Sequence, residues 1–420
     1  MPINKHAQTV INRLTEAGYE AYLVGGCVRD MLLGREPKDF DVVTDAYPEQ
    51  VKAVFNNCRL IGRRFRLAHV WFGREIIEVA TYRARHSGAG EWTDVENRPR
   101  DNDYGTQEED AWRRDFTVNA LYYDVNQAAV IDYVGGLEDL DAGLLRLIGD
   151  PETRYREDPV RMLRIVRFAA KLGLRIHPDS EAPLFKLGEL LEYIPPARLF
   201  EETLKLFMGG CALDTFEMLR HYGLFGHLFP YTETCLAYEE QGFPLMLLHN
   251  ALRNTDQRIM EDKPVTPGFL MAALLWEPMR RLADELKGQG MSELQAIQAS
   301  GTEVFVQQTR RVSMPRRFSQ MAREIWQLQP RLFRRTGKQP SRLILHPRFR
   351  AAYDFLLLRG EAGEDVQAVG QWWTEFQEAD EAGRTALMGG LPGKKRSRSG
   401  GKRRRGRAAR QSTQQSEPQP

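Results

Sequence analysis

Two short motifs near the N-terminus carry residues whose types and spacing could do chemistry. Gly25 and Gly26 follow a short apolar run, and Asp39 and Asp41 lie two positions apart further on. Glycines between a strand and a helix let backbone N–H groups approach an anion closely. Two carboxylates on one face of a predicted strand repel each other unless a cation such as Mg²⁺ lies between them. Either motif alone is typical of a tight turn or of solvated aspartates, but their order and spacing together favour a phosphate and metal site.

Two further charged residues fit the same site. Arg29 lies one turn into the helix expected after the glycines and could bind a phosphate group. Glu78 interrupts an apolar run, where a charge is costly to bury without a partner. It could be a third metal ligand, or it could point to solvent with Ile77 and Val79 on the opposite face of the strand.

A second cluster occupies residues 113–120. Arg114 could bind a triphosphate through two N–H groups, and Asp115 and Asn119 could hydrogen-bond ribose hydroxyls. The alternative is a helix-capping aspartate beside surface arginines.

A third cluster lies on a helix expected from about residue 156 onward. At 100° per residue, Glu157, Arg161, Arg164 and Phe168 share one face of that helix. Arginine and carboxylate groups side by side can present donors and acceptors to a nucleobase. An ordinary ion pair between Glu157 and Arg161, four residues apart, remains the alternative for this spacing.

Basic and aromatic residues also alternate elsewhere, at 63–70 and in later helices, where Arg310, Arg311, Arg316, Arg317, Arg334 and Arg335 lie near Trp326 and Phe333. Cations that contact phosphates and rings that stack on bases suit single-stranded RNA. Solvated helix faces are the alternative for any one of these runs, and His69 alone is typical of a structural histidine.

The elements that must position these residues follow from hydrophobic periodicity and turn signals. A mixed α/β domain is expected over residues 20–145, and helices dominate from 148 to about 385. Residues 83–107 are predicted to be a mobile loop. Residues 386–420 have too few apolar groups to offset the entropy of ordering, so they are predicted to be disordered. Helices are expected at 3–18, 27–33 and 48–56, and strands at 20–24, 40–43, 67–72, 76–82, 119–125 and 129–134.

The composition of the chain limits its class. Of the 420 residues, 42% are hydrophobic and 28% charged, which is typical of a globular protein. No run of about 18 apolar residues occurs, so no integral membrane segment is expected. The four cysteines form no CxxC pair, which argues against zinc ligation and a disulfide framework. The N-terminus lacks the layout of a signal peptide, so a cytoplasmic location is expected.

The charge of the chain is unevenly distributed. Ten basic residues and no acidic one lie between Lys394 and Arg410, and only Glu417 is charged after that. Without these, the 59 basic and 57 acidic side chains become 49 and 56 in residues 1–393, a net charge of −7. The basic tail therefore predicts an anionic partner, either nucleic acid or a membrane surface.

Together these segments resemble the bacterial family of poly(A) polymerases and CCA-adding enzymes, the class II nucleotidyltransferases. The resemblance implies an α+β fold, in which a polymerase-β-like head with a mixed sheet precedes all-α neck, body and leg domains and a disordered basic tail. The expected limits are 1–147 for the head, 148–212 for the neck, 213–385 for the body and RNA-binding region, and 386–420 for the tail. The matching stretches are 23–30, 38–44, 113–122, 132–139 and 154–169.

The resemblance also implies the site and its reaction. Asp39, Asp41 and Asp115 would be catalytic, with Mg²⁺ held by Asp39, Asp41 and Glu78. The nucleotide would be bound by Gly25, Gly26, Arg29, Arg114, Asn119, Asp158, Arg161 and Arg164. The implied reaction is template-independent transfer of AMP from ATP to RNA 3′ ends, with release of pyrophosphate, in RNA polyadenylation and decay.

Within this family, the stretch 60–70 and the basic tail resemble the poly(A) polymerases more than the CCA-adding enzymes. No His-Asp dipeptide occurs, so the phosphohydrolase module of some CCA-adding relatives is absent. The implied partners are ATP, RNA 3′ ends (mRNA fragments, regulatory RNAs and tRNA precursors) and RNA-decay proteins. A CCA-adding tRNA nucleotidyltransferase and a non-catalytic RNA-binding protein remain the alternatives.

Overall fold

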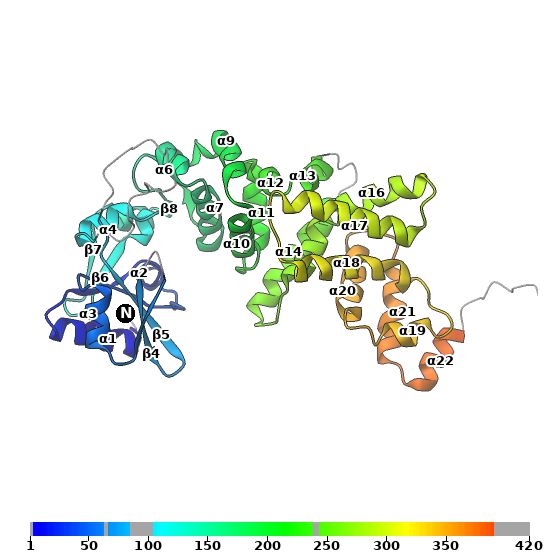
Figure 1. Ribbon diagram of the computed structural model, residues 1–420, viewed down its shortest axis with the longest axis horizontal. Coiled ribbons are helices and arrows are strands. Elements are labelled where there is room, and N and C mark those ends of the chain that lie inside the picture. The colour runs from blue at the N-terminus through cyan, green and yellow to red at the C-terminus, as the bar shows by residue number, and fades with distance from the viewer. Residues whose placement is uncertain (1–2, 63–65, 85–103, 238–242, 390–420) are drawn as a thin grey trace, which may run out of the picture.

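A seven-stranded mixed sheet forms the N-terminal part of the chain, and helices extend away from it along the long axis of the molecule (Figure 1). The computed structural model describes residues 3–62, 66–84, 104–237 and 243–389. The fold is therefore α+β, as expected. The predictions for the basic residues at 63–65, for most of the loop at 83–107 and for the tail beyond 389 lie outside the described residues.

The order of strands in the sheet is β3-β4-β5-β2-β1-β6-β7, and only β2 and β5 pair in parallel. Antiparallel neighbours are joined by short connections, whereas the parallel pair needs a longer crossover through α3 and the β3–β4 hairpin. The strands are β1 Ala21–Val24, β2 Asp41–Thr44, β3 Cys58–Ile61, β4 Leu67–Phe72, β5 Glu75–Thr81, β6 Leu121–Asp124 and β7 Ala129–Asp132.

Two helices from the N-terminal part of the chain pack on one face of the sheet. α1 (Lys5–Glu16) and α3 (Pro48–Val54) pack on it and bury every second residue of the central strands. Val42, Val70 and Val79 point to this side and are at most 2% exposed. Because side chains alternate along a strand, the residues next to these valines point to the opposite face of the sheet.

The opposite face is covered over its β1, β6 and β7 strands. There α4 (Gln107–Arg113) contributes Ala111 to a small buried cluster with Val24, Val43 and Tyr122. No residue of β3 or β4 belongs to this cluster in the described part of the chain. Within the described residues, this cluster therefore leaves β3 and β4 bare on the face where Asp41 and Glu78 lie.

Short elements connect the sheet to the helical part. They are α2 (Gly26–Leu32), the 3-10 turn η1 (Thr117–Asn119), α5 (Gly136–Asp141) and the two-residue strands β8 (Leu144–Leu145) and β9 (Arg175–Ile176), which pair in parallel.

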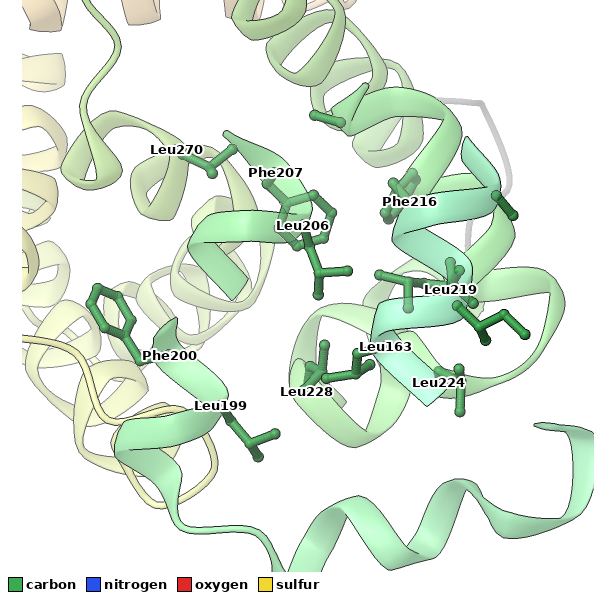
Figure 2. Packing of buried hydrophobic residues seen from close by; sticks show 14 of the residues in the cluster. Leu163, Leu199, Phe200, Leu206, Phe207, Phe216, Leu219, Leu224, Leu228 and Leu270 are labelled. Carbon is green, nitrogen blue, oxygen red and sulfur yellow. The ribbon is translucent and has the colours of Figure 1, made fainter. Parts of the chain in front are cut away.

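The rest of the described chain is helical, and a large hydrophobic cluster runs from the sheet into it. Figure 2 shows part of that packing, which includes Leu163, Leu219, Leu224 and Leu228. The elements are α6 Pro151–Glu157, α7 Val160–Leu172, α8 Pro178–Glu181, α9 Leu184–Leu187, η2 Gly188–Tyr193, α10 Pro196–Phe207, α11 Ala212–His221, α12 Leu224–Leu228, α13 Pro230–Ala237, α14 Phe243–Met260, α15 Pro267–Leu274, α16 Trp276–Gly288, α17 Glu293–Thr309, α18 Arg316–Leu332, α19 Gln339–Leu343, α20 Phe349–Glu361, α21 Gln367–Glu378 and α22 Glu381–Gly389.

Two predicted element boundaries were wrong in ways that matter for the site. Asp39 precedes β2, which begins at Asp41, because β1 ends at Val24 and offers no partner further along. The helix expected to carry Glu157 is broken, since proline disfavours a helical conformation in the residue before it. α6 therefore ends at Glu157, and α7 begins only after Pro159.

Three other observations revise the sequence expectations. β3 was not predicted, although its residues alternate between buried and exposed. The expectation that Trp326 stacks on a base is wrong, because Trp326 is fully buried and donates its indole N–H to the carbonyl of Ala272. Phe333, the other aromatic residue of that prediction, is exposed. No helix in the described part of the chain is both long and apolar enough to cross a membrane.

Candidate active site

The carboxylates of Asp41 and Glu78 are brought together by strand register. Asp41 is the first residue of β2, and its partner in the parallel strand β5 is Glu78. Glu78 pairs in turn with His69 of β4, whose Nε2 lies 3.4 Å from Glu78 Oε1. Paired residues project from the same face of a sheet. Glu78 therefore lies on the exposed face, and Ile77 and Val79 are buried on the other, as predicted.

Several charges act on Asp41. Its pKa is raised to about 6, mainly by burial and then by the negative charges of Glu78 and Asp39, while the positive charge of Arg114 opposes the rise. Asp39 itself is exposed, just before the strand. A group of like charges with a raised pKa is a place where a bound cation would lower the free energy.

The glycine turn lies directly beside these charges. Gly25 has φ +78° and ψ −126°, a conformation that residues with a side chain rarely adopt. A Cβ added there would lie 3.3 Å from Nη1 of Arg114 and 3.5 Å from the carbonyl oxygen of Asn119. The Cys27 thiol in the following helix lies 4.0 Å from the carbonyl oxygen of Asp41. The turn and the acidic strand, 14 residues apart in sequence, thus form one site.

Hydrogen bonds fix the guanidinium of Arg29 beside this turn. Only 4% of it is exposed, and its guanidinium donates to Asp30 at 2.7 and 2.9 Å and to the side-chain oxygen of Asn119. Its Nη2 would lie 3.6 Å from a Cβ added at Gly26. Three of its five N–H groups are therefore used, and two remain for an anion.

Arg114 is fixed by a buried carboxylate that the sequence reasoning missed. Asp110 is 5% exposed and accepts two hydrogen bonds from Arg114, at 2.9 and 3.1 Å, and one from the hydroxyl of Tyr122 at 2.9 Å. Asp110 is the last of three acidic residues in the first turn of α4, a pattern typical of a solvent-exposed helix N-terminus. Only its position four residues before Arg114 could have predicted this ion pair from the sequence.

Asp115 forms the centre of a second network. Its carboxylate accepts from the backbone N–H of Phe116 at 2.9 Å, from the amide of Asn119 at 3.3 Å and from two N–H groups of Arg164 on α7. Burial alone would raise the pKa of Asp115, but the charge and hydrogen bonds of Arg164 hold it below its ordinary value. A residue of the head is thereby tied to a helix of the neck.

A cavity of about 420 Å³ lies between the head and the neck helices. It is lined by Asp115, which the sequence analysis assigned to catalysis, and by Arg114, Asp158, Arg161 and Arg164, which it assigned to nucleotide binding. The full lining comes from four separate sequence regions, at 80–83, 110–115, 158–164 and 198–202. Its size is in the range of small-molecule sites.

Asp158 and Arg161 are also paired within the cavity, like Arg114, Asp115 and Arg164. Asp158 accepts a hydrogen bond from Arg198 of α10 at 2.8 Å. Arg161 donates to Glu157 at 3.0 Å, so the ion pair that was the alternative for this spacing does form. Arg161 also donates to the carbonyl of Arg154 at 2.7 Å. Asp158 lies before α7 rather than on it, contrary to the expectation of a single helix.

Two other arginines were missed by the sequence analysis. Arg198 also lines the cavity. Arg154 donates to the backbone carbonyls of Arg113 and Arg114 at 3.1 and 2.9 Å and so attaches α6 to the end of α4. These contacts join residues about 40 positions apart, so local spacing does not predict them; the only local sign is the pairing of Arg154 with Glu157, three residues on, at 3.1 Å.

The donor set suits a hard divalent cation. Among the described residues, no three His, Cys, Asp or Glu side chains stand together as a complete set of metal ligands. Mg²⁺ is typically bound by one or two carboxylates together with waters and substrate phosphates. The crowded carboxylates at Asp41, beside a turn that can bind phosphate, have the chemistry that such an ion requires.

Comparison with known families gives three matches along the chain. Residues 21–146 match the family model described as "Poly A polymerase head domain". Residues 173–236 match "Probable RNA and SrmB- binding site of polymerase A", and residues 289–411 match "Polymerase A arginine-rich C-terminus". The first match contains the carboxylates, the glycine turn and Asp115.

Individual relatives divide into two groups by how much of the chain they cover. Poly(A) polymerase I of Escherichia coli O6:H1 is 51% identical over 385 residues, covering 89% of this chain and 83% of that protein. The CCA-adding enzyme of Lactobacillus helveticus is 38% identical over 216 residues, covering 50% of this chain and 52% of that enzyme. The crystal structure of the Bacillus stearothermophilus CCA-adding enzyme in complex with CTP has a TM-score of 0.58 at 25% identity, covering 93% of this chain and 89% of that chain.

Proposed function

The chain belongs to the poly(A) polymerase family, and from that membership we infer that it is a polynucleotide adenylyltransferase, which adds AMP from ATP to RNA 3′ ends without a template. The observation that carries this function is the 51% identity that extends over 89% of the chain. By contrast, the 38% identity to the CCA-adding enzyme of Lactobacillus helveticus extends over 50% of this chain.

We propose that Asp39 and Asp41 hold Mg²⁺, with Glu78 as a third carboxylate. When bound, the metal would lower the pKa of the attacking RNA 3′-hydroxyl and stabilise the charge that develops on the α-phosphate and on the leaving pyrophosphate. The raised pKa of Asp41 supports this assignment, because a cation between the carboxylates would offset both the cost of burying its charge, which is the larger cause of the rise, and the repulsion from Glu78 and Asp39.

The glycine turn and two arginines would hold the triphosphate. The backbone at Gly25 and Gly26 has no side chain in the way, so an anion can approach it closely. Arg29 and Arg114 each retain unused N–H groups and border the same turn. Because partners already fix both guanidinium groups, little side-chain entropy would be lost when they bind phosphate.

The cavity between head and neck would hold the nucleoside. Asn119 is the candidate for the ribose, since it is oriented by Arg29 and Asp115. Asp158, Arg161 and Arg164 would contact the base. Asp115 would act by holding Arg164 and Asn119 in place, which explains why a half-buried carboxylate belongs in this site.

Substitution of one carboxylate tests the proposal. Asp39→Ala should lower AMP incorporation into a plain oligoribonucleotide by about a thousandfold, since metal stabilisation supplies several kcal/mol. RNA affinity should change less than about twofold. Glu49→Gln removes an exposed charge ten residues away and serves as the matched control. Undiminished incorporation by the Asp39 variant would refute the assignment.

The CCA-adding alternative needs a separate assay because the fold likeness to that enzyme covers most of the chain. The wild-type protein is given a plain oligoribonucleotide, or a tRNA lacking its terminal CCA, with ATP or CTP alone. A poly(A) polymerase incorporates AMP into both RNAs. Incorporation of CMP into the tRNA would favour the alternative.

We also propose that RNA-decay proteins contact this chain. The segment 173–236 matches a family region whose description names both RNA and SrmB, so its exposed surface is the place to look for such a contact. Loss of binding to decay proteins after surface substitutions there, with unchanged AMP incorporation, would support this partner assignment.

A further inference from the structure

In the described part of the chain, the face of β3 and β4 that the small buried cluster leaves bare continues the row of catalytic carboxylates outward. Asp41 pairs with Glu78, Glu78 with His69, and His69 with Arg59 of the outermost strand β3. At about 4.8 Å between neighbouring strands, this row is about 14 Å long. It runs in one straight line from the proposed metal site to the edge of the sheet.

Two large apolar side chains flank this row on the same face. Trp71 lies two residues after His69 on β4 and is 37% exposed, and Ile61 lies two residues after Arg59 on β3 and is 44% exposed. Their neighbours Cys58 and Val70 point to the buried face. Exposed large apolar groups gathered beside a functional site are characteristic of binding surfaces.

Arg59 is a free cation on this surface. It is exposed, and within the described residues its guanidinium has no ion pair or hydrogen bond. By contrast, the nearby Arg66 is paired with Glu49, and the arginines of the nucleotide cavity are held by carboxylates. A cation without a protein partner beside an exposed indole ring has the chemistry that binds the phosphate and base of a single-stranded nucleic acid.

The in-line geometry of the reaction indicates which substrate approaches from the side of β3 and β4. The phosphate-binding turn follows β1, which flanks β2 on one side, whereas β5, β4 and β3 extend on the other. In phosphoryl transfer the attacking and leaving oxygens lie roughly in line. Pyrophosphate leaves toward the turn at Gly25, so the RNA hydroxyl must approach from the side of Glu78.

We propose that the face of β3 and β4 binds the last nucleotides of the RNA substrate, with Trp71 stacking on a base and Arg59 contacting a phosphate. This inference rests on the proposed adenylyl transfer and extends it to the second substrate. His69, held 3.4 Å from Glu78, separates the catalytic carboxylates from this RNA contact and is a positioning residue between them.

The test compares Arg59→Ala, Trp71→Ala and Trp71→Phe in the full-length protein. The KM for a 15-nucleotide oligoadenylate and the KM for ATP are measured separately. Lys52→Ala removes an exposed charge from α3 on the opposite face of the sheet and is the matched control. Thermal unfolding of each variant shows whether it is folded.

Arg59→Ala and Trp71→Ala should each raise the KM for RNA about tenfold, because one base–aromatic stack or one phosphate contact is lost. The KM for ATP should stay within about twofold. Trp71→Phe should recover most of the RNA affinity, because it keeps an aromatic ring. Arg59→Ala should also reduce the slope of log K against log salt by about 0.7, whereas Trp71→Ala should leave it unchanged.

The proposal is overturned if the KM for RNA is unchanged in both alanine variants while the wild-type protein incorporates AMP. Equal changes in both KM values, or an effect of Lys52→Ala of the same size, would also overturn it, because they would point to a general disturbance of the head. If the wild-type protein itself transferred no AMP, the adenylyltransferase assignment would fail instead. A photoreactive 4-thiouridine near the RNA 3′ end should crosslink to residues 58–72, and crosslinks confined to other segments would contradict the proposed site.

Discussion

The contact between Asp115 and Arg164 allows a sharp test of how the head is tied to the neck. Asp115→Asn keeps the shape of the side chain and the oxygen that accepts from Phe116 and Asn119. It replaces Oδ2 with an NH2 group, so the negative charge opposite Arg164 and the acceptor of its two hydrogen bonds are lost together. Charge-assisted hydrogen bonds contribute about 1.5 to 3 kcal/mol. Since about a third of the Arg164 side chain is exposed, solvent screening puts the expected loss near the lower end, at about 2 kcal/mol.

The effect of this substitution should depend on pH in a defined direction. The folded-state pKa of Asp115 lies below its ordinary value of about 3.9. Its charge therefore stabilises the folded state fully above about pH 5, and that stabilisation is lost as the pH falls through the folded-state pKa. The free-energy difference between the wild-type protein and the variant should be largest at pH 7 and should shrink below about pH 4.

Urea unfolding, followed by circular dichroism between pH 7 and pH 3.5, measures this difference. Glu152→Gln breaks an exposed pair with Arg156 in the neighbouring helix and should cost less than about 0.5 kcal/mol. AMP incorporation by Asp115→Asn should fall as well, because Arg164 and Asn119 lose their common partner. A difference in unfolding free energy that stayed constant down to pH 3.5, or a cost for Glu152→Gln as large as that for Asp115→Asn, would refute the reasoning.

Two further outcomes are expected. Gly25→Ala should raise the KM for ATP and destabilise the head by about 1 to 2 kcal/mol, because its φ of +78° is strained for alanine and the new Cβ would meet Nη1 of Arg114 at 3.3 Å. Nucleotide titration and thermal unfolding would measure this, and an unchanged KM would show that the turn does not contact phosphate. Deletion of residues 391–420 should weaken RNA binding and flatten its salt dependence, since ten basic residues are removed. Binding measured between 50 and 200 mM salt tests this, and an unchanged slope would assign the tail to another partner.

The spacing of residues in the sequence was sufficient to predict contacts that lie within one turn or one secondary-structure element. The glycine turn, the position of Arg29 after it and the pairing of Glu157 with Arg161 were all predicted because each depends on residues at most about four positions apart. The alternation that puts Glu78 opposite Ile77 and Val79 was likewise predicted from the two-residue period of a strand.

The sequence by itself therefore determined which chemical groups the protein carries and, through its family resemblance, the reaction they serve. Only the tertiary structure decided which groups meet. The register that sets Asp41 beside Glu78 joins strands through a crossover of 30 residues, 45–74. Asp115 meets Arg164 across 49 residues, and Asp158 meets Arg198 across 40. No periodic pattern encodes such contacts, because they depend on how elements distant in the sequence pack on a shared hydrophobic core.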